Sequence, residues 1–499
     1  MIFSNPELVR NVRTQLRPGK MVTAAVISIA LSLVAGYALT HISAPATGPM
    51  GWGFGLLRGL FWLQALILAA GGGISCVNAI YKEKDQNTFD YQRVTRLSPL
   101  ELTLGKLFGA PIFIYFICLC FVPLVIFAAV KGQQSFTFVL AAYAVLIIGS
   151  IAFHTLALLI SLLTVRGSHT TAIIFVLILL WLFSNIFVLT ANYLYLAPLS
   201  PFYSADVASQ QRSNYLRTSL SKDLVFGHPV HHVFVLIIID GLLTAWFLLA
   251  LSRNIKRDPD QYELYSPLET FALAICINVI LLAFVNWSAD LINVQATLLT
   301  INISILSFLG LAQLRNRDRT RRILRTQKKS PISWIDLSWP APFLFITALT
   351  ACALVFAAAA IARNPLMEWS PVFAIFRFLF ITAWLVRDMQ FLQWMTLRRG
   401  KRPLVAGVMF LTAFYACVGI VLSAFGTFRD VDNLPFSAFF LPTPIYYLDP
   451  AAWATRPAIW GAAFVAQWLV VALFILAQRK TIIELAHPTT PDSETLNAD

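Results

Sequence analysis

Long apolar stretches alternate with short polar segments along the whole chain. A helix of about 18 apolar residues is long enough to cross a bilayer, and twelve stretches reach or approach that length. They lie near residues 21–40, 57–80, 107–130, 137–165, 171–194, 232–252, 268–286, 289–313, 340–362, 371–397, 403–425 and 458–478. The pattern predicts an all-α fold, a polytopic transmembrane helical bundle of about 12 spans.

The polar segment 82–106, between the second and third predicted spans, carries two helix-start signals. Asn87-Thr88 can cap a first short helix. Ser98-Pro99-Leu100-Glu101 reads as a capping box that starts a second one, with Ser at N-cap, Pro at N1 and Glu at N3. The segment therefore predicts a hairpin of short helices at the membrane surface, where a partner docks.

The first twenty residues predict an interfacial helix. Asn5 caps it, Pro6 takes N1 and Pro18-Gly19 end it, while Leu8 and its i+4 neighbours line one face and arginines line another. An ordinary basic flank of the first span is the alternative. The following apolar stretch is longer than the 7–15 residues of a signal-peptide core, so no cleavage is expected.

Composition supports a membrane protein, because 58% of residues are hydrophobic and only 12% are charged, against about 25% charged in soluble domains. The net charge of +13 invites a nucleic-acid partner, but the basic residues concentrate in the loops on the N-terminal side of the membrane. This distribution follows the positive-inside rule and predicts cytoplasmic N- and C-termini. Nucleic acid is therefore not an expected partner. The six cysteines all lie within predicted spans, without a CxxC motif, so no disulfide is expected.

The hairpin segment resembles the loop after the second span in export permeases of the ABC superfamily's second type. The matching residues are Glu83, Asp85, Thr88, Ser98, Pro99, Leu100, Gly105 and Lys106. The family usually has Gly where this chain has Asn87. The N-terminal NPELVRNVR is similar to the family's connecting helix, and Pro198-Leu199-Ser200-Pro201 is similar to its loop after the fifth span. The resemblance covers the first half of the chain well and the second half weakly.

The resemblance implies a permease subunit in the inner cell membrane, an exporter, coupled at the eight matching residues and Glu101 to separate ABC ATPase subunits. ATP and magnesium would bind that partner, because the chain has no G-x-x-x-x-G-K-[ST] motif. No enzyme activity, cofactor or metal is expected in this chain. Its expected partners are the ATPase, membrane lipids and an exported substrate of unknown kind. Gly71-Gly72-Gly73 lies in an apolar span and predicts close helix packing.

The second half of the chain resembles the first at several points. Pro201–Asp206 aligns with Pro444–Asp449, and Ser98-Pro99 aligns with Ser330-Pro331. These matches predict a parallel duplication, with the divisions 1–20, 21–257, 258–480 and 481–499 as interfacial helix, first six-span half, diverged second half and cytoplasmic tail.

The second inner hairpin differs from the first, because arginines replace its acidic pair. It is read either as a docking site of different charge or as a polybasic segment facing anionic lipid. Those arginines are Arg315, Arg317 and Arg319.

A few ionisable residues lie within predicted spans, where each costs roughly 2.5–3.5 kcal/mol on insertion scales. They are the candidate pathway residues His154, Asp240, Arg377, Arg387 and Asp388. His154 and Arg387 could line a shared cavity; alternatively, Arg387 and Asp388 pair locally or lie in water. These residues also allow an ion-gradient-driven secondary transporter as the alternative function, and a non-transporting membrane scaffold is the third.

His228, His231 and His232 have no acidic or cysteine partner beside them in the sequence. We interpret them as interfacial histidines rather than a zinc site.

Overall fold

The fold was obtained as a computed structural model. It describes residues 5–163, 222–225, 228–258, 262, 264–283, 285, 291–315, 317–326, 356, 371–398, 403–425, 434–442 and 456–486, some of them by backbone only. The chain divides into two compact units, residues 1–264 and 265–499. The boundary falls close to the predicted division at 257/258, while the duplication and the six-span halves stay predictions.

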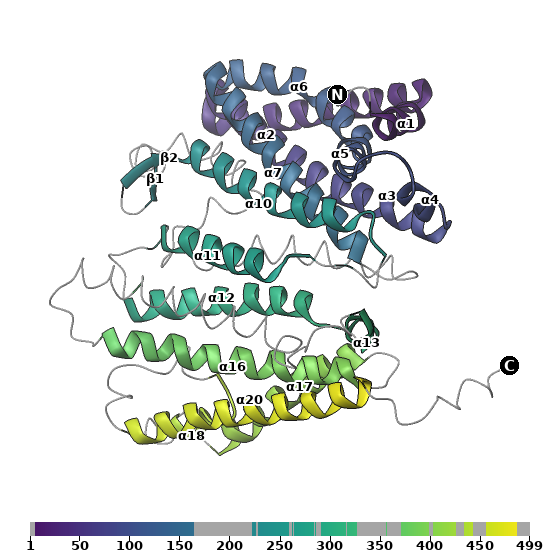
Figure 1. The fold of residues 1–499 in the computed structure, drawn as a ribbon. Helices are drawn as coiled ribbons and strands as arrows, with labels where there is room; N and C mark the ends of the chain where they lie inside the picture. The colour runs from purple at the N-terminus through teal and green to yellow at the C-terminus, as the bar shows by residue number, and fades with distance from the viewer. Residues whose placement is uncertain are drawn as a thin grey trace. The chain divides into compact units, whose positions relative to one another are not determined.

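The first unit is almost entirely helical (Figure 1). Its elements are α1 (Pro6–Gln15), α2 (Pro18–Leu66), the π-helix η2 (Ile67–Gly72), α3 (Gly73–Asp85), α4 (Phe89–Arg93), α5 (Pro99–Gly109), α6 (Ile112–Lys131), α7 (Phe136–Leu163), β1 (Lys222–Val225), β2 (His228–His231) and α10 (His232–Asn254).

The described part of the second unit is helical. Its elements are α11 (Pro267–Ala283), α12 (Leu291–Gln313), α13 (Arg317–Thr326), α16 (Pro371–Leu397), α17 (Pro403–Ala424), α18 (Leu434–Ser437) and α20 (Pro457–Ala486). Helix α20 continues to Ala486, so the predicted tail 481–499 begins inside a helix.

Six helices of the described chain are long and apolar enough to cross a membrane. They are Gly53–Asp85, Ile112–Lys131, Phe136–Leu163, Val233–Asn254, Pro403–Ala424 and Pro457–Leu485. Shorter apolar helices cover Pro18–Leu31, Leu268–Ala283 and Val294–Ile303. The chain is therefore a multi-pass helical membrane protein. The predicted span 171–194 lies outside the described residues, as does 340–362 except for residue 356, and the count of twelve stays a prediction.

The all-α prediction misses one small element. Strands β1 and β2 form an antiparallel hairpin in which Lys222 pairs with His231 and Val225 with His228. This hairpin leads directly into α10, and two of the three clustered histidines lie in β2. The apolar pattern used to find spans carries no signal for strands this short.

Helix α2 contains the first predicted span and the beginning of the second in one element of 49 residues, which would be roughly 70 Å long if straight. Both of its ends instead lie beside the start of α6, because Gly19, Ile67 and Phe113 line one groove. At the other end of α6, a Cβ on Gly53 would lie 2.5 Å from the Gly132 backbone nitrogen. The chain thus passes along α6 twice in opposite directions, as the two predicted spans require.

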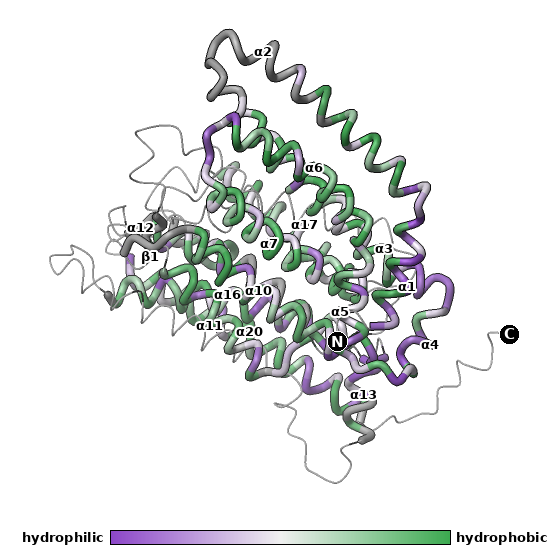
Figure 2. Tube along the Cα trace, turned by 90° about the horizontal axis from the view of Figure 1, so that it is seen from above, coloured by the Kyte–Doolittle hydropathy of each residue, from purple (hydrophilic) through white to green (hydrophobic). Residues whose placement is uncertain are grey.

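The core of the first unit forms where the second pass of α2 packs against α6 and α7. Phe61, Leu57 and Val125 are fully buried there, and Gln64 Nε2 donates to the Tyr143 hydroxyl at 3.2 Å. Figure 2 shows apolar residues along α6 and α7 and hydrophilic residues around α1 and α4, at one end of these helices. The predicted hairpin lies at this polar end.

The core of the second unit centres on α16, which packs against α17 and α20. Aromatic rings dominate it, with Phe380 and Trp460 fully buried and their ring centroids 6.5 Å apart. Polar side chains also lie inside this core, and α16 supplies several of them, among them Arg377 and Gln390.

Candidate functional site

Segment 82–106 forms the last turn of α3, the short helix α4 and most of α5. Helix α3 ends in a Schellman motif, because the Thr88 N–H donates to the Glu83 carbonyl at 2.9 Å and the Asn87 N–H to the Lys84 carbonyl at 3.3 Å. Asn87 has φ 57°, in the left-handed region that asparagine tolerates. The prediction that Asn87-Thr88 caps the next helix is wrong. The Thr88 side chain makes no capping bond to α4, and its hydroxyl donates to the Glu83 carbonyl instead.

The predicted capping box at the start of α5 is confirmed. The Glu101 N–H donates to Ser98 Oγ at 3.2 Å, and the Ser98 N–H donates to Glu101 Oε2 at 2.8 Å, with Pro99 at N1. The bond from the Ser98 backbone lowers the pKa of Glu101 below its usual value. Helix α5 then continues to Gly109, beyond the predicted start of the third span at residue 107.

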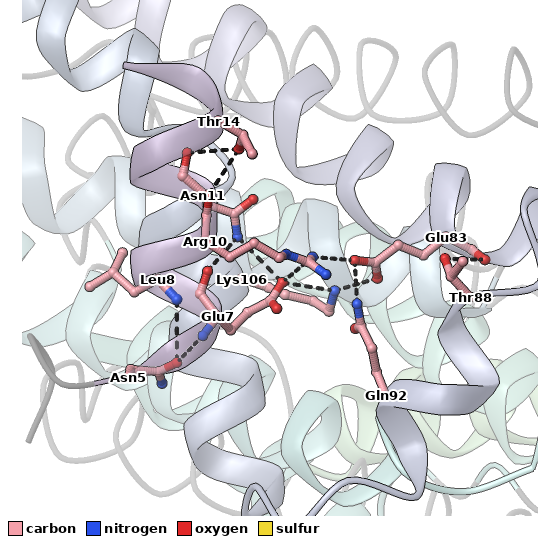
Figure 3. A network of polar contacts seen from close by, with 10 residues as sticks. All are labelled: Asn5, Glu7, Leu8, Arg10, Asn11, Thr14, Glu83, Thr88, Gln92 and Lys106. Carbon is pink, nitrogen blue, oxygen red and sulfur yellow. Dashed lines mark hydrogen bonds and ion pairs between the residues drawn. The ribbon is translucent and has the colours of Figure 1, made fainter. Parts of the chain in front are cut away.

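A closed ring of four ionised side chains joins α1, α3 and α5 (Figure 3). This charge ring consists of Glu7, Arg10, Glu83 and Lys106. Arg10 Nη2 lies 2.7 Å from both Glu7 Oε1 and Glu83 Oε1. Lys106 Nζ pairs with Glu83 Oε2 and, at 3.4 Å, with Glu7 Oε1. The ring contains two positive and two negative side chains, so its charges balance. Gln92 of α4 donates a hydrogen bond of 2.6 Å to Glu83, which attaches a fourth helix to the ring.

Most of the charge ring is inside the protein. Lys106 is 1% exposed, Glu7 6% and Glu83 9%, whereas the Arg10 side chain is half exposed. Burial alone would lower the pKa of Arg10, but its bonds with Glu83 and Glu7 outweigh that effect and raise the pKa. Two predicted coupling residues, Glu83 and Lys106, therefore hold helices together and present little surface to a partner.

Two glycines of α5 allow α1 to lie directly against it. A Cβ on Gly105 would lie 2.7 Å from the Cβ of Glu7, and one on Gly109 would lie 2.8 Å from Asn11 Nδ2. This small-xxx-small spacing lets helix backbones approach closely. The sequence analysis identified Gly105 but missed Gly109 and Glu7. The spacing of four residues between Gly105 and Gly109 is a sequence signal for a close helix contact. Glu7 and Asn11 on α1 have the same spacing and lie opposite the two glycines.

Helix α1 begins as predicted but ends earlier. Asn5 Oδ1 accepts from the Glu7 and Leu8 N–H groups, and Pro6 stands at N1. The Asn5 side chain also donates to the Glu101 carbonyl at 2.6 Å. Pro18 does not end this helix, which stops at Gln15; it starts α2. The predicted interfacial helix is therefore also a helix docked on α5.

Further bonds fix the hairpin to α7 and to the loop after α10. Lys84 Nζ donates to the carbonyls of Ser161 and Leu162 at the end of α7, at 3.0 and 2.5 Å, where a cation is favourable. Lys256 Nζ donates to the Thr95 carbonyl at 2.8 Å.

Arg93 of α4 adds ion pairs that no sequence signal suggested. It pairs with Asp258 in the loop after α10 and, at 3.0 Å, with Asp90 of its own helix. Burial would lower the pKa of Arg93, but these two carboxylates raise it. The hairpin is thus held by α1, by α7 and by this loop.

The remaining coupling residues predicted from the sequence lie on the surface. These are Asp85, Thr88, Ser98, Pro99, Leu100 and Glu101. Among them stand large apolar side chains with no cover in the described chain: Val94 is 82% exposed, Tyr91 76% and Leu100 48%. We call Tyr91, Val94 and Leu100 the exposed apolar set of the hairpin. Tyr91 and Val94 were not identified from the sequence.

Of the candidate pathway residues, His154 is fully buried and has a hydrogen bond at each ring nitrogen. Its Nε2 lies 2.8 Å from the Leu68 carbonyl of η2, and its Nδ1 lies 2.9 Å from the Tyr115 hydroxyl. A carbonyl only accepts, so Nε2 carries the proton and Nδ1 accepts from Tyr115. A Cβ on Gly72 would lie 2.1 Å from Nε2. Gly72 therefore makes the space that His154 fills, as the prediction of close packing at Gly71-Gly72-Gly73 requires.

Asp240, in α10, lies against α7, because a Cβ on Gly149 would be 3.1 Å from its Oδ2. Within the described chain its carboxylate has no hydrogen bond or ion pair.

The three candidate pathway residues of the second unit all lie on α16. Arg387 and Asp388 do pair with each other, at 2.6 Å. Arg387 also donates to Gln467 of α20 and Tyr415 of α17, at 2.9 and 2.6 Å, and Tyr415 donates to Asp388. We call Arg387, Asp388, Tyr415 and Gln467 the α16 cluster. Separately, Arg377 is fully buried and bonds to Gln295 of α12 at 3.4 Å.

The cavity predicted between His154 and Arg387 would join two separate units, and it stays a prediction. Of the basic second hairpin, Arg317 and Arg319 lie in α13. The backbone N–H of Arg315 donates to Gln393 of α16 at 2.9 Å.

Comparison with protein-family models, with curated proteins and with solved structures gave no match. The function is therefore argued from the residues of the chain itself.

Proposed function

We propose that the chain is the transmembrane permease subunit of an ABC export system, located in the inner cell membrane with twelve spans and cytoplasmic termini. Separate ATPase subunits would dock at the hairpin and supply ATP hydrolysis with bound magnesium. The support is the resemblance of segment 82–106 to such permeases together with the way this segment folds.

The observation that carries the proposal is a polar hairpin that buried ion pairs tie to its neighbours and that carries three large apolar side chains on its surface. The charge ring and the Arg93–Asp258 pair fix its position, while the exposed apolar set points away from the described chain. Exposed aromatic and aliphatic residues amid polar ones are typical of a protein–protein contact, where a few such anchors supply most of the binding energy.

The predicted coupling residues then divide into two roles. Asp85, Thr88, Pro99 and Leu100 would face the ATPase, because they are exposed, and Ser98 and Glu101 fix the start of α5. Glu83, Gly105 and Lys106 would transmit movement, because they join α3 and α5 to α1.

Movement of the docked hairpin would reach the membrane through the helices that continue from it. Helix α3 leads into η2, a π-helical segment in the middle of a candidate span, and α5 leads into α6. π-helical segments interrupt regular helix bonding and occur frequently at functional sites. His154 bonds to η2 at Leu68, so the segment is linked to α7 as well. The transported substrate is not indicated by these residues.

A photo-cross-linking side chain placed at residue 94 in the full chain, expressed in its native membranes, tests the docking. We expect a cross-link to a polypeptide that contains a P-loop motif and hydrolyses ATP. Phe136 gives a matched control, because it is 75% exposed and begins α7, at the far end of α6 from the hairpin.

The proposal fails if residue 94 gives no cross-link to an ATPase, or if residue 136 gives the same product with equal yield. A purified chain that moves solute without any ATPase would also contradict it.

A second candidate function is transport driven by an ion gradient, and one observation favours it. The Asp240 carboxylate lies within a candidate span beside Gly149, with no partner in the described chain, and unpaired carboxylates in lipid are costly. If Asp240→Asn abolishes transport while Val94→Arg leaves it intact, this second function replaces the first. If the chain is a non-transporting scaffold, the wild-type chain itself moves no solute, and neither Asp240→Asn nor Val94→Arg changes that.

A further inference from the structure

An apolar groove opens in the first unit, between the two passes of α2 and helix α6. Its volume is about 430 Å³, within the range of roughly 300–1,000 Å³ typical of small-molecule sites. Its walls come from Thr23, Ala24 and Ile27 on the first pass, Ile67 at the end of the second, and aromatic residues of α6. It is remote in sequence from the hairpin's exposed apolar set.

Small residues on α2 create this groove. Gly19 stands about one turn before Thr23 and Ala24 on the helix. These small residues leave room that the longer side chains of Phe113 and Ile117 border from the other side. The surrounding surface of α2 is strongly apolar, with Val26 60% and Ile27 53% exposed. Such a surface is stable against hydrocarbon, so the part of the occupant that lies beside Ala24 and Ile27 must be apolar.

The length of the groove fits a single lipid chain. From Gly19 to Leu31 the helix advances twelve residues, or roughly 18 Å. One leaflet of a bilayer contributes roughly 15 Å of hydrocarbon, half of the total core thickness. An extended acyl chain of an ordinary phospholipid would therefore fill the groove from one end to the other.

Positive charge stands at one end of the groove only. Lys20 is a lining residue, and Arg17 and Arg13 precede it; all three are exposed. In the described chain none of these side chains has an ion pair or hydrogen bond. Glu7 is the only acidic residue in the first 82 positions, and the charge ring already uses it. A negatively charged group at this end would meet Lys20 in the groove wall, with Arg17 one turn before it on the chain.

We propose that this groove binds one anionic phospholipid of the surrounding bilayer, with an acyl chain along Ala24 and Ile27 and the phosphate headgroup at Lys20 and Arg17. Each basic residue near a membrane surface adds about 1 kcal/mol of attraction for anionic lipid. The chain contact holds the lipid in place, and the basic end selects its headgroup. This site does not depend on the proposed docking of an ATPase.

Native mass spectrometry of the purified full chain, with added phosphatidylglycerol or phosphatidylcholine of identical acyl chains, tests the site. We expect the wild-type chain to retain one phosphatidylglycerol in preference to phosphatidylcholine. Lys20→Gln and Arg17→Gln should each lower phosphatidylglycerol retention about fivefold and leave phosphatidylcholine unchanged. Ala24→Phe, which fills the groove, should reduce retention of both lipids.

Two variants control for charge and folding. Lys20→Arg keeps the charge and should retain the lipid, and Arg96→Gln removes an exposed cation of the α4–α5 connection and should have no effect. Ala24→Leu, a smaller filling, provides a second test if Ala24→Phe does not fold. The proposal is overturned if the wild-type chain shows no preference for phosphatidylglycerol, or if the Lys20 and Arg17 variants retain it as the wild type does. Cross-linking at residue 94 should be the same in all these variants. A loss of lipid retention without a loss of this cross-link therefore concerns the lipid site alone and not the docking of an ATPase.

Discussion

The charge ring of the first unit and the α16 cluster of the second unit both bury ionised side chains, but they connect different things. The charge ring joins Glu7 and Arg10 of α1 to Glu83 and Lys106, with 73 positions between Arg10 and Glu83 and 99 between Glu7 and Lys106, across three helices and next to the exposed hairpin. In the α16 cluster, the ions are sequence neighbours on one helix, and neutral groups of Tyr415 and Gln467 complete their bonds.

The difference teaches what each arrangement can do. An ion pair made within one helix stays paired when that helix moves, so the α16 cluster stabilises a packed core. The charge ring loses its pairs between helices if α1, α3 and α5 separate, so it makes these helices move together. Helices that transmit movement from a docking surface must move together, and the charge ring has this property.

The largest effect is expected for Lys106→Met. The change removes the buried one of the two cations that Glu83 and Glu7 share and leaves only the half-exposed Arg10, and loss of one partner of a buried ion pair costs about 3–5 kcal/mol. Reversible unfolding in mixed detergent micelles should show this loss in the free energy of unfolding. Lys82→Met, at an exposed position at the start of the hairpin segment, should change it little. Equal free energies of unfolding for the Lys106 variant and the wild type would show that the charge ring does not stabilise the fold.

Gly105→Ala should have the next largest effect. The new Cβ would lie 2.7 Å from the Cβ of Glu7, so α1 must move away from α5, and overpacking of this kind costs about 1–3 kcal/mol. Gly55→Ala is the matched control, because nothing lies within 4 Å of its Cβ position and alanine favours a helix. The first variant should unfold more easily and the second no more easily than the wild type; the opposite order would exclude close packing at Gly105.

Tyr415→Phe tests the α16 cluster. Its effect on the free energy of unfolding should be equal to that of Gly105→Ala or smaller. The hydroxyl that bonds both Arg387 and Asp388 is removed, which leaves polar groups unsatisfied at a cost of about 1–3 kcal/mol. Unfolding should be easier, whereas lipid retention and cross-linking at residue 94 should not change. A Tyr91→Phe variant, at a position 76% exposed, should match the wild type in stability. Loss of residue-94 cross-linking in the Tyr415 variant would contradict the separation of the two regions.

The smallest effect is a pH dependence at the start of α5. The pKa of Glu101 is lowered in the folded protein, so its contribution is present above its unfolded pKa and is lost as the pH falls through the folded value. Hydrogen exchange of the amides in residues 98–102 should therefore be slower in the wild type than in Glu101→Gln at neutral pH. The two should converge in acid, after correction for intrinsic exchange rates. If the wild type still exchanges more slowly than Glu101→Gln at a pH where Glu101 is protonated, the Glu101 carboxylate is not the cause of the slower exchange.

Local features of this chain could be predicted from the sequence because their causes are local. The Asn5 cap, the capping box at Ser98 and the apolar helices all follow from residues within one or two turns of each other. A second capping box at Ser266, with the same four residues Ser-Pro-Leu-Glu, starts α11 in the same way. The sequence analysis passed over it and compared Ser98-Pro99 with Ser330-Pro331, which lies outside the described residues.

The site itself was only half predictable. Segment 82–106 could be recognised, but the partners of Glu83 and Lys106 come from α1, and helix periodicity does not show which faces meet. The arginines of α1 were placed on one face of an interfacial helix without partners, whereas Arg10 pairs with Glu83. The cap assigned to Asn87-Thr88 failed for a similar reason, since the same residues can end one helix or start another.

ATP hydrolysis by the complex that co-purifies with the full chain from native membranes tests the central claim most directly. We predict an ATPase bound to the wild-type chain and lost from Val94→Arg, while the variant keeps the stability of the wild type. A chain that brings down no ATPase even after cross-linking, or a Val94→Arg variant that retains it fully, would contradict the account.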